Sequence, residues 1–262
     1  MKHIRYLIIP IICLCIFSVD HFSVKRAEIV SKYTSIRPTR WGMFIPGVKT
    51  HIKTDSKVIA LTFDGCGGPK GSLFDKELIS YLISEKIPAT LFLTDSWINA
   101  NEGNLKEIAN NPLFELENHG LRHKPASVKG ACAWHIRGTL NAGDCFDEAE
   151  KCALAFEHRF GHRPKFYRSG TAYYDDVAIK IIRETGQIPM NFSCVVADAD
   201  HILTLKRVEN NIRRGIKNGA VLIMHLNHPG GKTLPALKEM IPEIKAKGYS
   251  FVRLSDMESN LE

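Results

Sequence analysis

From Val58 onward, short apolar runs alternate with longer amphipathic runs, and this alternation limits the folds open to the chain more than any other feature. A short apolar run bounded by turn residues predicts a buried strand, and an amphipathic run predicts a helix with one apolar face. Repeated units of this kind build a parallel sheet covered by helices. About seven strands are expected, fewer than the eight of a standard barrel. They are Val58–Phe63, Ala89–Leu93, Phe114–Glu117, Lys165–Tyr167, Ile188–Ser193, Ala220–Met224 and Tyr249–Leu254.

Helices are expected between these strands, because each intervening run begins near a polar, Pro or Gly signal and several end at Gly. A hydrophobic content of 44% in 262 residues suits one globular domain with a substantial core. The predicted helices are Leu73–Glu85, Gly103–Ala109, Asp147–Arg159, Asp176–Glu184, Leu205–Lys217 and Leu234–Lys247.

The N-terminus has the pattern of an export signal. Lys2 and Arg5 precede an apolar run, Leu7–Val19, that is right for a signal peptide and short for a membrane-spanning helix. No good small-residue cleavage site follows this run, so an uncleaved anchor associated with the membrane is the alternative. We therefore expect residues 1–22 to be a signal peptide or N-terminal anchor, 23–55 a lead-in segment and 56–262 the main domain of an exported protein, periplasmic or facing the cell exterior.

The chain is basic, with a formal net charge of +7 and a sequence pI near 9.0. In an exported protein this charge favours cell-wall polymer or lipid headgroups as surroundings, although solubility alone explains it equally well. No zinc-finger spacing, aromatic-basic run or clustered basic helix is present, so no nucleic-acid partner is expected.

The third predicted strand ends in two histidines, His119 and His123, in a stretch where Gly120 and Pro125 force the chain to turn. Imidazole is a common ligand of zinc-like metals. A gap of four residues lets both rings converge on one ion if the segment forms a single helical turn. The pair is therefore a candidate metal site.

His158 and His162 have the same spacing and serve as an internal comparison. They fall where a charged helix gives way to Gly161 and Pro164, a pattern typical of a solvated helix end. Spacing alone therefore does not predict a metal site, and the first pair depends on its neighbours.

Ionisable side chains follow five of the predicted strands. In a parallel barrel, chemistry gathers at the carboxyl ends of the strands, because the loops there converge on one mouth. Each residue alone has an ordinary explanation, such as a helix cap, a surface cation or a core histidine, but together they predict an active site. They are Asp64, the two histidines His119 and His123, Arg168, Asp198 with Asp200, and His225 with His228.

In this order, the residues resemble the five motifs of the polysaccharide deacetylases of the NodB-homology type. The motifs are Leu-Thr-Phe-Asp at 61–64, His-x-x-x-His at 119–123, Arg168 with Tyr173, Asp198, and Leu-Ile-Met-His at 222–225. The resemblance covers about residues 58–254. It implies a distorted (β/α)7 barrel. It also implies metal-dependent removal of N-acetyl groups from an amino-sugar polymer such as peptidoglycan, a chitin-like polymer or an exopolysaccharide.

The resemblance also implies roles for the first motifs. His119 and His123 would hold a divalent metal, with zinc expected, which polarises the acetyl carbonyl and acidifies a bound water. Asp64 would take the proton from that water, and Arg168 would pair with Asp64 and orient it.

The remaining motifs would complete the reaction. Asp198 would hold either Arg168 or His225, and His225 would protonate the departing amine. A backbone N–H near Tyr173 would meet the oxyanion, and the Tyr173 ring is a candidate for stacking on a sugar.

One position departs from the family pattern. A second Asp usually follows the first and ligates the metal, whereas this chain has Gly65. Another group could complete the site, the metal could be held by two histidines with waters or Asp64, or metal chemistry could be lost. Cys66 is either a thiolate ligand or a small buried hydrophobe, and the buried role is favoured. Restoring the family pattern with Gly65→Asp is a check on these alternatives, since tighter metal binding with activity retained would support a site that otherwise lacks a ligand.

Two alternative functions follow from that departure. The first is a metal-independent amidase of small cyclic amides, which the missing Asp permits and the signal-like N-terminus opposes. The second is a carbohydrate-binding pseudoenzyme that kept the groove. The presence of Asp64, Arg168 and His225 argues against a pseudoenzyme, because binding alone needs no base paired with an acid.

Overall fold

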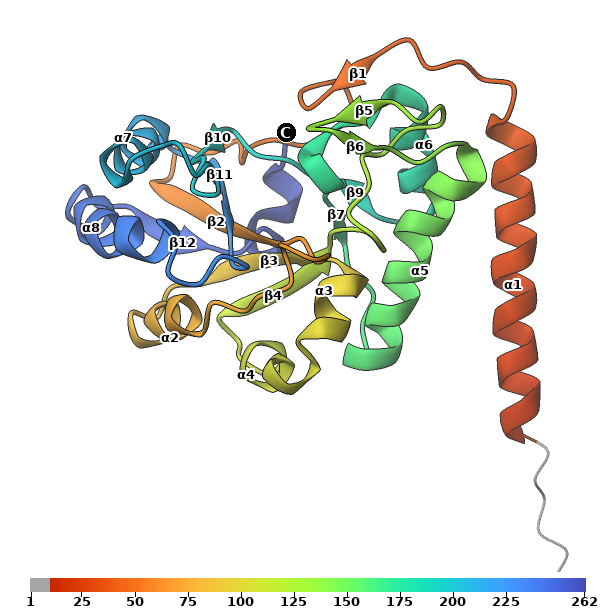
Figure 1. The fold of residues 1–262 in the computed structure, drawn as a ribbon, viewed down its shortest axis with the longest axis horizontal. Coiled ribbons are helices and arrows are strands. Elements are labelled where there is room, and N and C mark those ends of the chain that lie inside the picture. Colours follow the sequence, from red (N-terminus) through yellow and green to blue (C-terminus); the bar gives the residue numbers. More distant parts are fainter. Residues whose placement is uncertain (1–9) are drawn as a thin grey trace, which may run out of the picture.

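The computed structural model describes residues 10–262, with side chains described from His21 onward, and its centre is a parallel sheet (Figure 1). Eight strands pair in the order β10-β11-β2-β3-β4-β7-β9, and β12 also pairs with β2. Every pairing between them is parallel. The strands are β2 (Val58–Gly65), β3 (Ala89–Leu93), β4 (Phe114–Asn118), β7 (Phe166–Tyr167), β9 (Ile188–Pro189), β10 (Cys194–Val195), β11 (Ala220–His225) and β12 (Ser250–Val252).

The predicted strand at 188–193 is not one continuous strand, and residues 188–195 contribute a short strand to each edge of the sheet. Its first part, β9, pairs with β7, while the following β10 pairs with β11. The chain between them therefore joins the two edges of the curled sheet. Because β9 and β10 share one position, the barrel has seven strand positions, and the predicted distorted (β/α)7 barrel is confirmed. Strands β12 and β3 share one edge of β2, at residues 58–60 and 62–65.

The helices cover the outside of the sheet, largely as predicted. Helix α6 matches its predicted range, and α5 begins earlier than predicted because the Asn141 side chain accepts a hydrogen bond from the N–H of Asp144. Helix α3 was not predicted, because six residues are too few to show a helical period. The helices are α2 (Lys76–Ser84), α3 (Asp95–Ala100), α4 (Leu105–Ala109), α5 (Ala142–Phe160), α6 (Asp176–Glu184), α7 (Leu205–Gly215) and α8 (Thr233–Ala246).

Short elements decorate the ends of the barrel. Strand β1 (Trp41–Gly42) pairs with β8 (Tyr174–Asp175), and β5 (Cys132–Ala133) pairs with β6 (Ile136–Arg137), both antiparallel. Three 3₁₀ turns complete the structure: η1 (Glu102–Asn104), η2 (Gly170–Ala172) and η3 (Ser255–Asn260).

An N-terminal helix, α1 (Pro10–Tyr33), lies against α5 and α6 on the outside of the barrel (Figure 1). Its C-terminal part belongs to the core, since Ile29 and Tyr33 are buried. Arg26 also forms a 2.8 Å ion pair with Asp147 of α5. The predicted boundary between residues 22 and 23 falls inside this helix, and residues 1–9 of the predicted signal lie outside the described part of the chain.

No helix in the described part of the chain is both long enough and apolar enough to cross a membrane. After α1, the rest of the predicted lead-in segment returns to the barrel, where Lys49 bridges Met190 and Ile52 bridges Leu261. The Asn191 side chain also donates a 2.7 Å hydrogen bond to the Met43 carbonyl. These contacts place Met43 near the carboxyl ends of the strands.

Candidate functional site

Asp64, at the end of β2, forms a buried ion pair with Arg168, which follows β7. The distance between Asp64 Oδ1 and Arg168 Nη1 is 2.7 Å, and both side chains are buried. Arg168 also donates to Thr62 Oγ1 and to the Asn191 carbonyl, each at 2.9 Å, and its guanidinium lies 4.0 Å from the centre of the Phe92 ring. Arg168 is therefore fixed on several sides, so it holds the carboxylate in one orientation.

Asp64 is an anion in this setting. Burial raises the pKa of its carboxyl, but its neighbours, the charge of Arg168 foremost, outweigh burial and lower the pKa below its ordinary value. The structure thus brings Asp64 and Arg168 together in the arrangement expected of a base and the residue that orients it.

His119 lies directly beside this pair. Its Nδ1 is 2.9 Å from the Arg168 carbonyl oxygen, which can only accept, so Nδ1 carries the proton and Nε2 has the free lone pair. That Nε2 is 3.6 Å from Asp64 Oδ2 and 4.0 Å from Cys66 Sγ. The imidazole therefore presents a metal-binding nitrogen to the centre of the site.

His123 reaches the same centre, but not through the predicted helical turn. Gly120 (φ +89°) and His123 (φ +59°) both adopt left-handed backbone conformations, and the segment between them is irregular. The His119 and His123 ring centres are 4.8 Å apart. A Cβ at Gly170 would overlap the backbone of His123, so glycine is required there. Left-handed backbone at a non-glycine residue is costly and is common at functional sites.

Cys66 completes a group of three metal-binding side chains. The donor atoms of Cys66, His119 and His123 all lie within 4.8 Å of one another. Imidazole nitrogen and thiolate sulfur are the preferred ligands of zinc, so the residues present fit such an ion. The favoured role of Cys66 as a small buried hydrophobe is not what the structure shows, because its half-buried sulfur faces an imidazole.

The thiol of Cys66 is set up to ionise. Burial opposes ionisation, but the charge of His123 and the contact with His119 outweigh it and hold the pKa of the thiol well below its ordinary value. Among the residues whose side chains the structure describes, these are the only three such donors that lie together, and neither His158 nor His162 is among them.

On the other side of the site, Asp198 holds His225. Asp198 Oδ1 is 3.0 Å from His225 Nδ1, and Oδ2 accepts from the His225 N–H at 2.8 Å and from Thr233 Oγ1 at 2.6 Å. Of the two partners proposed for Asp198, the structure thus selects His225. Burial opposes protonation of His225, but the charge of Asp198 raises the pKa of the imidazole well above its ordinary value.

A cavity of about 290 Å³ opens between these groups. Asp64, Cys66, His123, Asp198 and His225 line one part of it. The rest is mainly apolar, and its apolar side chains come from the lead-in segment, the β5–β6 hairpin and the ends of several strands: Met43, Trp134, Ile136, Phe192, Val195 and Ile223.

A second and more open cavity of about 450 Å³ shares Cys66, His123 and His225 with the first and is lined by the loop at 66–71 and by Asn227 and His228.

Tyr173 does not line the first cavity. Its ring packs between Trp41 (5.5 Å between ring centres) and Trp134 (6.4 Å), and its backbone carbonyl accepts from the Ala126 N–H. Trp134 lines the cavity and is 69% exposed, so it is better placed than Tyr173 to contact a sugar. From the sequence, Trp134 was one of several aromatic residues that could stack on a sugar, and it ranked below Tyr173, because a lone aromatic in a loop carries no spacing signal.

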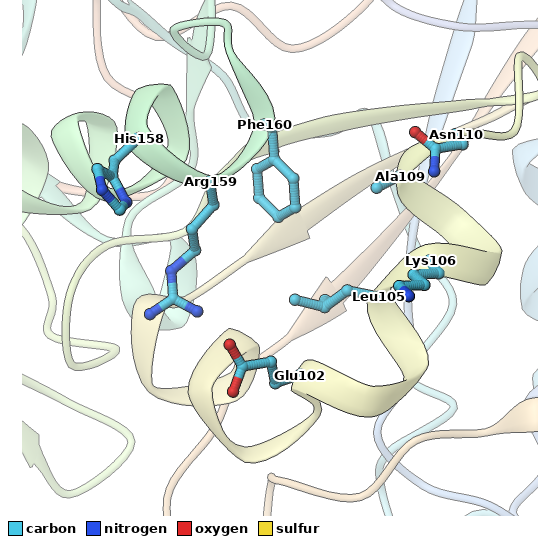
Figure 2. Close-up of a pocket in the computed structure, with 8 residues that line it drawn as sticks. All are labelled: Glu102, Leu105, Lys106, Ala109, Asn110, His158, Arg159 and Phe160. Atoms are coloured by element: carbon cyan, nitrogen blue, oxygen red, sulfur yellow. The ribbon is translucent and has the colours of Figure 1, made fainter.

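A further cavity of about 360 Å³ lies between α4 and the end of α5, and Figure 2 shows its lining. It contains His158, Arg159 and Lys106, but none of the residues predicted for catalysis. Helices α4 and α5 lead into the starts of β4 and β7, so this cavity lies away from the carboxyl ends of the strands.

Gly65 does not occupy a ligand position. A Cβ at this residue would lie 3.0 Å from the side chains of Leu93 and Trp97. Because side chains alternate along a strand, Asp64 faces the site and residue 65 faces α3. A carboxylate introduced by Gly65→Asp would therefore lie among apolar side chains rather than beside the histidines.

The sequence is similar to those of known proteins. The profile of the polysaccharide deacetylase family matches residues 51–189, just over half of the chain. The chain is 27% identical to an uncharacterized protein of Streptomyces coelicolor over 84% of this chain and 79% of that protein. It is 24% identical to a peptidoglycan-N-acetylglucosamine deacetylase of Bacillus cereus over 80% of this chain and 92% of that one.

Solved structures share the fold. A CE4-family pseudoenzyme from Bacillus anthracis superposes with a TM-score of 0.68 at 19% identity, over 82% of this chain and 69% of that one. A peptidoglycan N-acetylglucosamine deacetylase superposes with a TM-score of 0.66 at 24% identity, over 79% and 91%. The family profile, the relatives and the shared fold agree with the motif order along the strands, and the chain belongs to the polysaccharide deacetylase family.

Proposed function

We propose that this protein is an exported, metal-dependent hydrolase that removes N-acetyl groups from an amino-sugar polymer, with peptidoglycan, chitin-like and exopolysaccharide chains as the candidate substrates. One observation carries the proposal. Asp64, which pairs with the buried Arg168, lines the same cavity as the carboxylate–imidazole pair Asp198 and His225. Two of the three metal-binding donors, Cys66 and His123, line this cavity too. A base on one side and an acid on the other is what amide hydrolysis requires.

His119 and His123 would hold the divalent ion, with zinc as the proposed metal. When bound, such an ion polarises the acetyl carbonyl and lowers the pKa of a water. Asp64 accepts a proton from the attacking water, whose oxygen forms the new bond to the carbonyl carbon. Arg168 keeps the carboxylate turned toward that water, because it is fixed by Thr62 and Asn191.

His225 acts on the other half of the amide. It donates a proton to the nitrogen as the C–N bond breaks, which releases acetate and leaves the sugar with a free amine. Asp198 holds Nδ1 of the ring, so Nε2 is the nitrogen left to deliver the proton. The apolar walls of the cavity suit the acetyl methyl and the C–H face of a sugar, and Trp134 at the rim offers an exposed ring.

The deciding assay measures acetate release from chitooligosaccharides and from cell-wall glycan, before chelation, after chelation and after zinc is restored. The proposal expects release that chelation abolishes and zinc restores. Release at full rate after exhaustive chelation would support the metal-independent amidase. No release under any of these conditions would support the pseudoenzyme, a state known for a solved protein of this fold.

His225→Ala is expected to slow acetate release by about 10²- to 10⁴-fold while leaving metal content intact, because it removes a proton donor and no ligand. Acetate release and elemental analysis of the same preparation measure the two effects. His158→Ala, in the separate cavity of Figure 2, is the matched control and should change neither. Loss of metal in His225→Ala would make His225 a ligand and refute its role as the acid.

Asp198→Asn should change the pH dependence of the reaction. The acid must be protonated, so activity is present below the pKa of His225 and is lost as pH rises through it. The charge of Asp198 raises that pKa, and its removal lowers it. The fall in acetate release at high pH is therefore expected to move to lower pH in Asp198→Asn. If this fall does not move, a group other than His225 causes it.

Export is proposed from the basic start and the apolar run at 7–19. Fractionation of cells expressing the full-length chain should recover it at the membrane or outside the cytoplasm. Leu14→Lys should keep it inside, since a lysine in the middle of an apolar segment opposes insertion by about 2.5–3.5 kcal/mol. Full-length chain recovered as soluble cytoplasmic protein would refute export.

A further inference from the structure

Backbone hydrogen bonds and a glycine turn fix the position of Cys66. Its carbonyl accepts a 3.0 Å hydrogen bond from Thr94 Oγ1, the residue that also caps α3. Beyond it, Gly67 adopts φ +76° and donates to the Gly71 carbonyl at 2.9 Å, which folds the loop back. A side chain at Gly67 would overlap Ser96, so glycine is required for this turn. The loop therefore fixes where the sulfur of Cys66 points.

We propose that the Cys66 thiolate is the third protein ligand of the metal, which makes the site a Cys-His-His centre with His119 and His123. This proposal rests on the metal dependence stated in the proposed function. The sulfur is 4.0 Å from Nε2 of His119, and all three donor atoms lie within 4.8 Å of one another. Zinc binds sulfur at about 2.3 Å and nitrogen at about 2.0–2.1 Å, so small side-chain rotations bring the three donors onto one ion.

The other candidates for the third ligand are less suitable. Residue 65 faces Leu93 and Trp97, away from the histidines. Asp64 lies near enough, with Oδ2 at 3.6 Å from His119 Nε2, but its other oxygen is bound by Arg168 at 2.7 Å. With the thiolate as ligand, Asp64 stays available as the base.

A thiolate ligand makes the centre select among metal ions differently from a carboxylate ligand. Sulfur is a soft ligand and favours zinc and similar ions, whereas carboxylate and water oxygens suit magnesium, calcium and manganese. The centre is therefore expected to bind Zn²⁺ and Co²⁺ and to discriminate against Mg²⁺.

Cobalt reports directly on the ligand, because a thiolate bound to Co²⁺ gives a sulfur-to-metal charge-transfer band in the near ultraviolet. The full-length protein, freed of metal and titrated with Co²⁺, should develop this band at one equivalent. Cys66→Ser should lose the band and bind Co²⁺ more weakly than wild type by more than the roughly 10- to 100-fold that loss of an outer-shell partner costs. Cys132→Ser, which removes an exposed thiol, should keep both the band and the affinity.

Cys66→Asp shows whether loss of the band reflects the missing sulfur or a failure to fold. It supplies a carboxylate at the same position, so it should bind one Co²⁺ without the charge-transfer band. A wild-type protein that binds Co²⁺ without the band, or a Cys66→Ser variant that keeps it, would overturn the thiolate ligand. Metal-dependent acetate release without the band would overturn this inference and leave the proposed function standing. A protein that shows the band but releases no acetate would refute the proposed function, while Cys66 would still be a metal ligand.

Discussion

His119→Ala is expected to abolish both metal binding and acetate release. Nε2 of His119 lies 4.0 Å from Cys66 Sγ, and Nδ1 is fixed by the Arg168 carbonyl, so the ring is oriented before any ion binds. One remaining imidazole and a thiolate make a poor site for a labile divalent ion. Elemental analysis and acetate release, measured on the same purified protein, test both losses.

His158→Ala is the matched control for this experiment, because His158 belongs to a pair with the same spacing and should alter neither quantity. Circular dichroism during heating shows whether each variant is folded. His123→Ala gives an independent check, since His123 offers a second ligand from the same segment. Stoichiometric metal in folded His119→Ala would contradict the assigned centre.

Asp64→Asn is expected to keep its metal and lose turnover by about 10²- to 10⁴-fold, the usual effect of removing an acid–base group. The carboxylate is held by Arg168 at 2.7 Å, and an amide of the same shape cannot accept the proton. Stability should fall as well, by about 3–5 kcal/mol, because the buried Arg168 keeps its charge and loses its partner. Metal content, acetate release and chemical denaturation measure the three effects.

Asp147→Asn provides the control for the loss of an ion pair. Asp147 pairs with Arg26 across α5 and α1 in a partly exposed position, and such pairs contribute little to stability. That variant should keep its activity and nearly all of its stability. If metal and turnover disappear together in Asp64→Asn, Asp64 is itself a ligand and its role as the base fails.

The strands of the barrel were largely predictable from the sequence, because a strand buried on both faces reads as a continuous apolar run. Strand β3 matches its predicted range, and β2, β4 and β11 each extend only one or two residues beyond theirs. The prediction of one strand at 188–193 was wrong, since only Ile188–Pro189 form a strand there, paired with β7, and the next strand, β10, pairs with β11. Which neighbour a residue pairs with depends on the curl of the whole sheet and leaves no local signal.

For the site, the sequence by itself determined which ionisable groups follow the strands, because the ends of parallel strands must meet at one mouth. Asp64, Arg168 and His225 were found in this way. Only the tertiary structure decided that Asp198 holds His225 and that Cys66 faces His119, since these pairs join segments 27 and 53 residues apart. Distances between side chains on different strands follow from packing and backbone direction, and a left-handed turn such as that at His123 cannot be read from residue spacing.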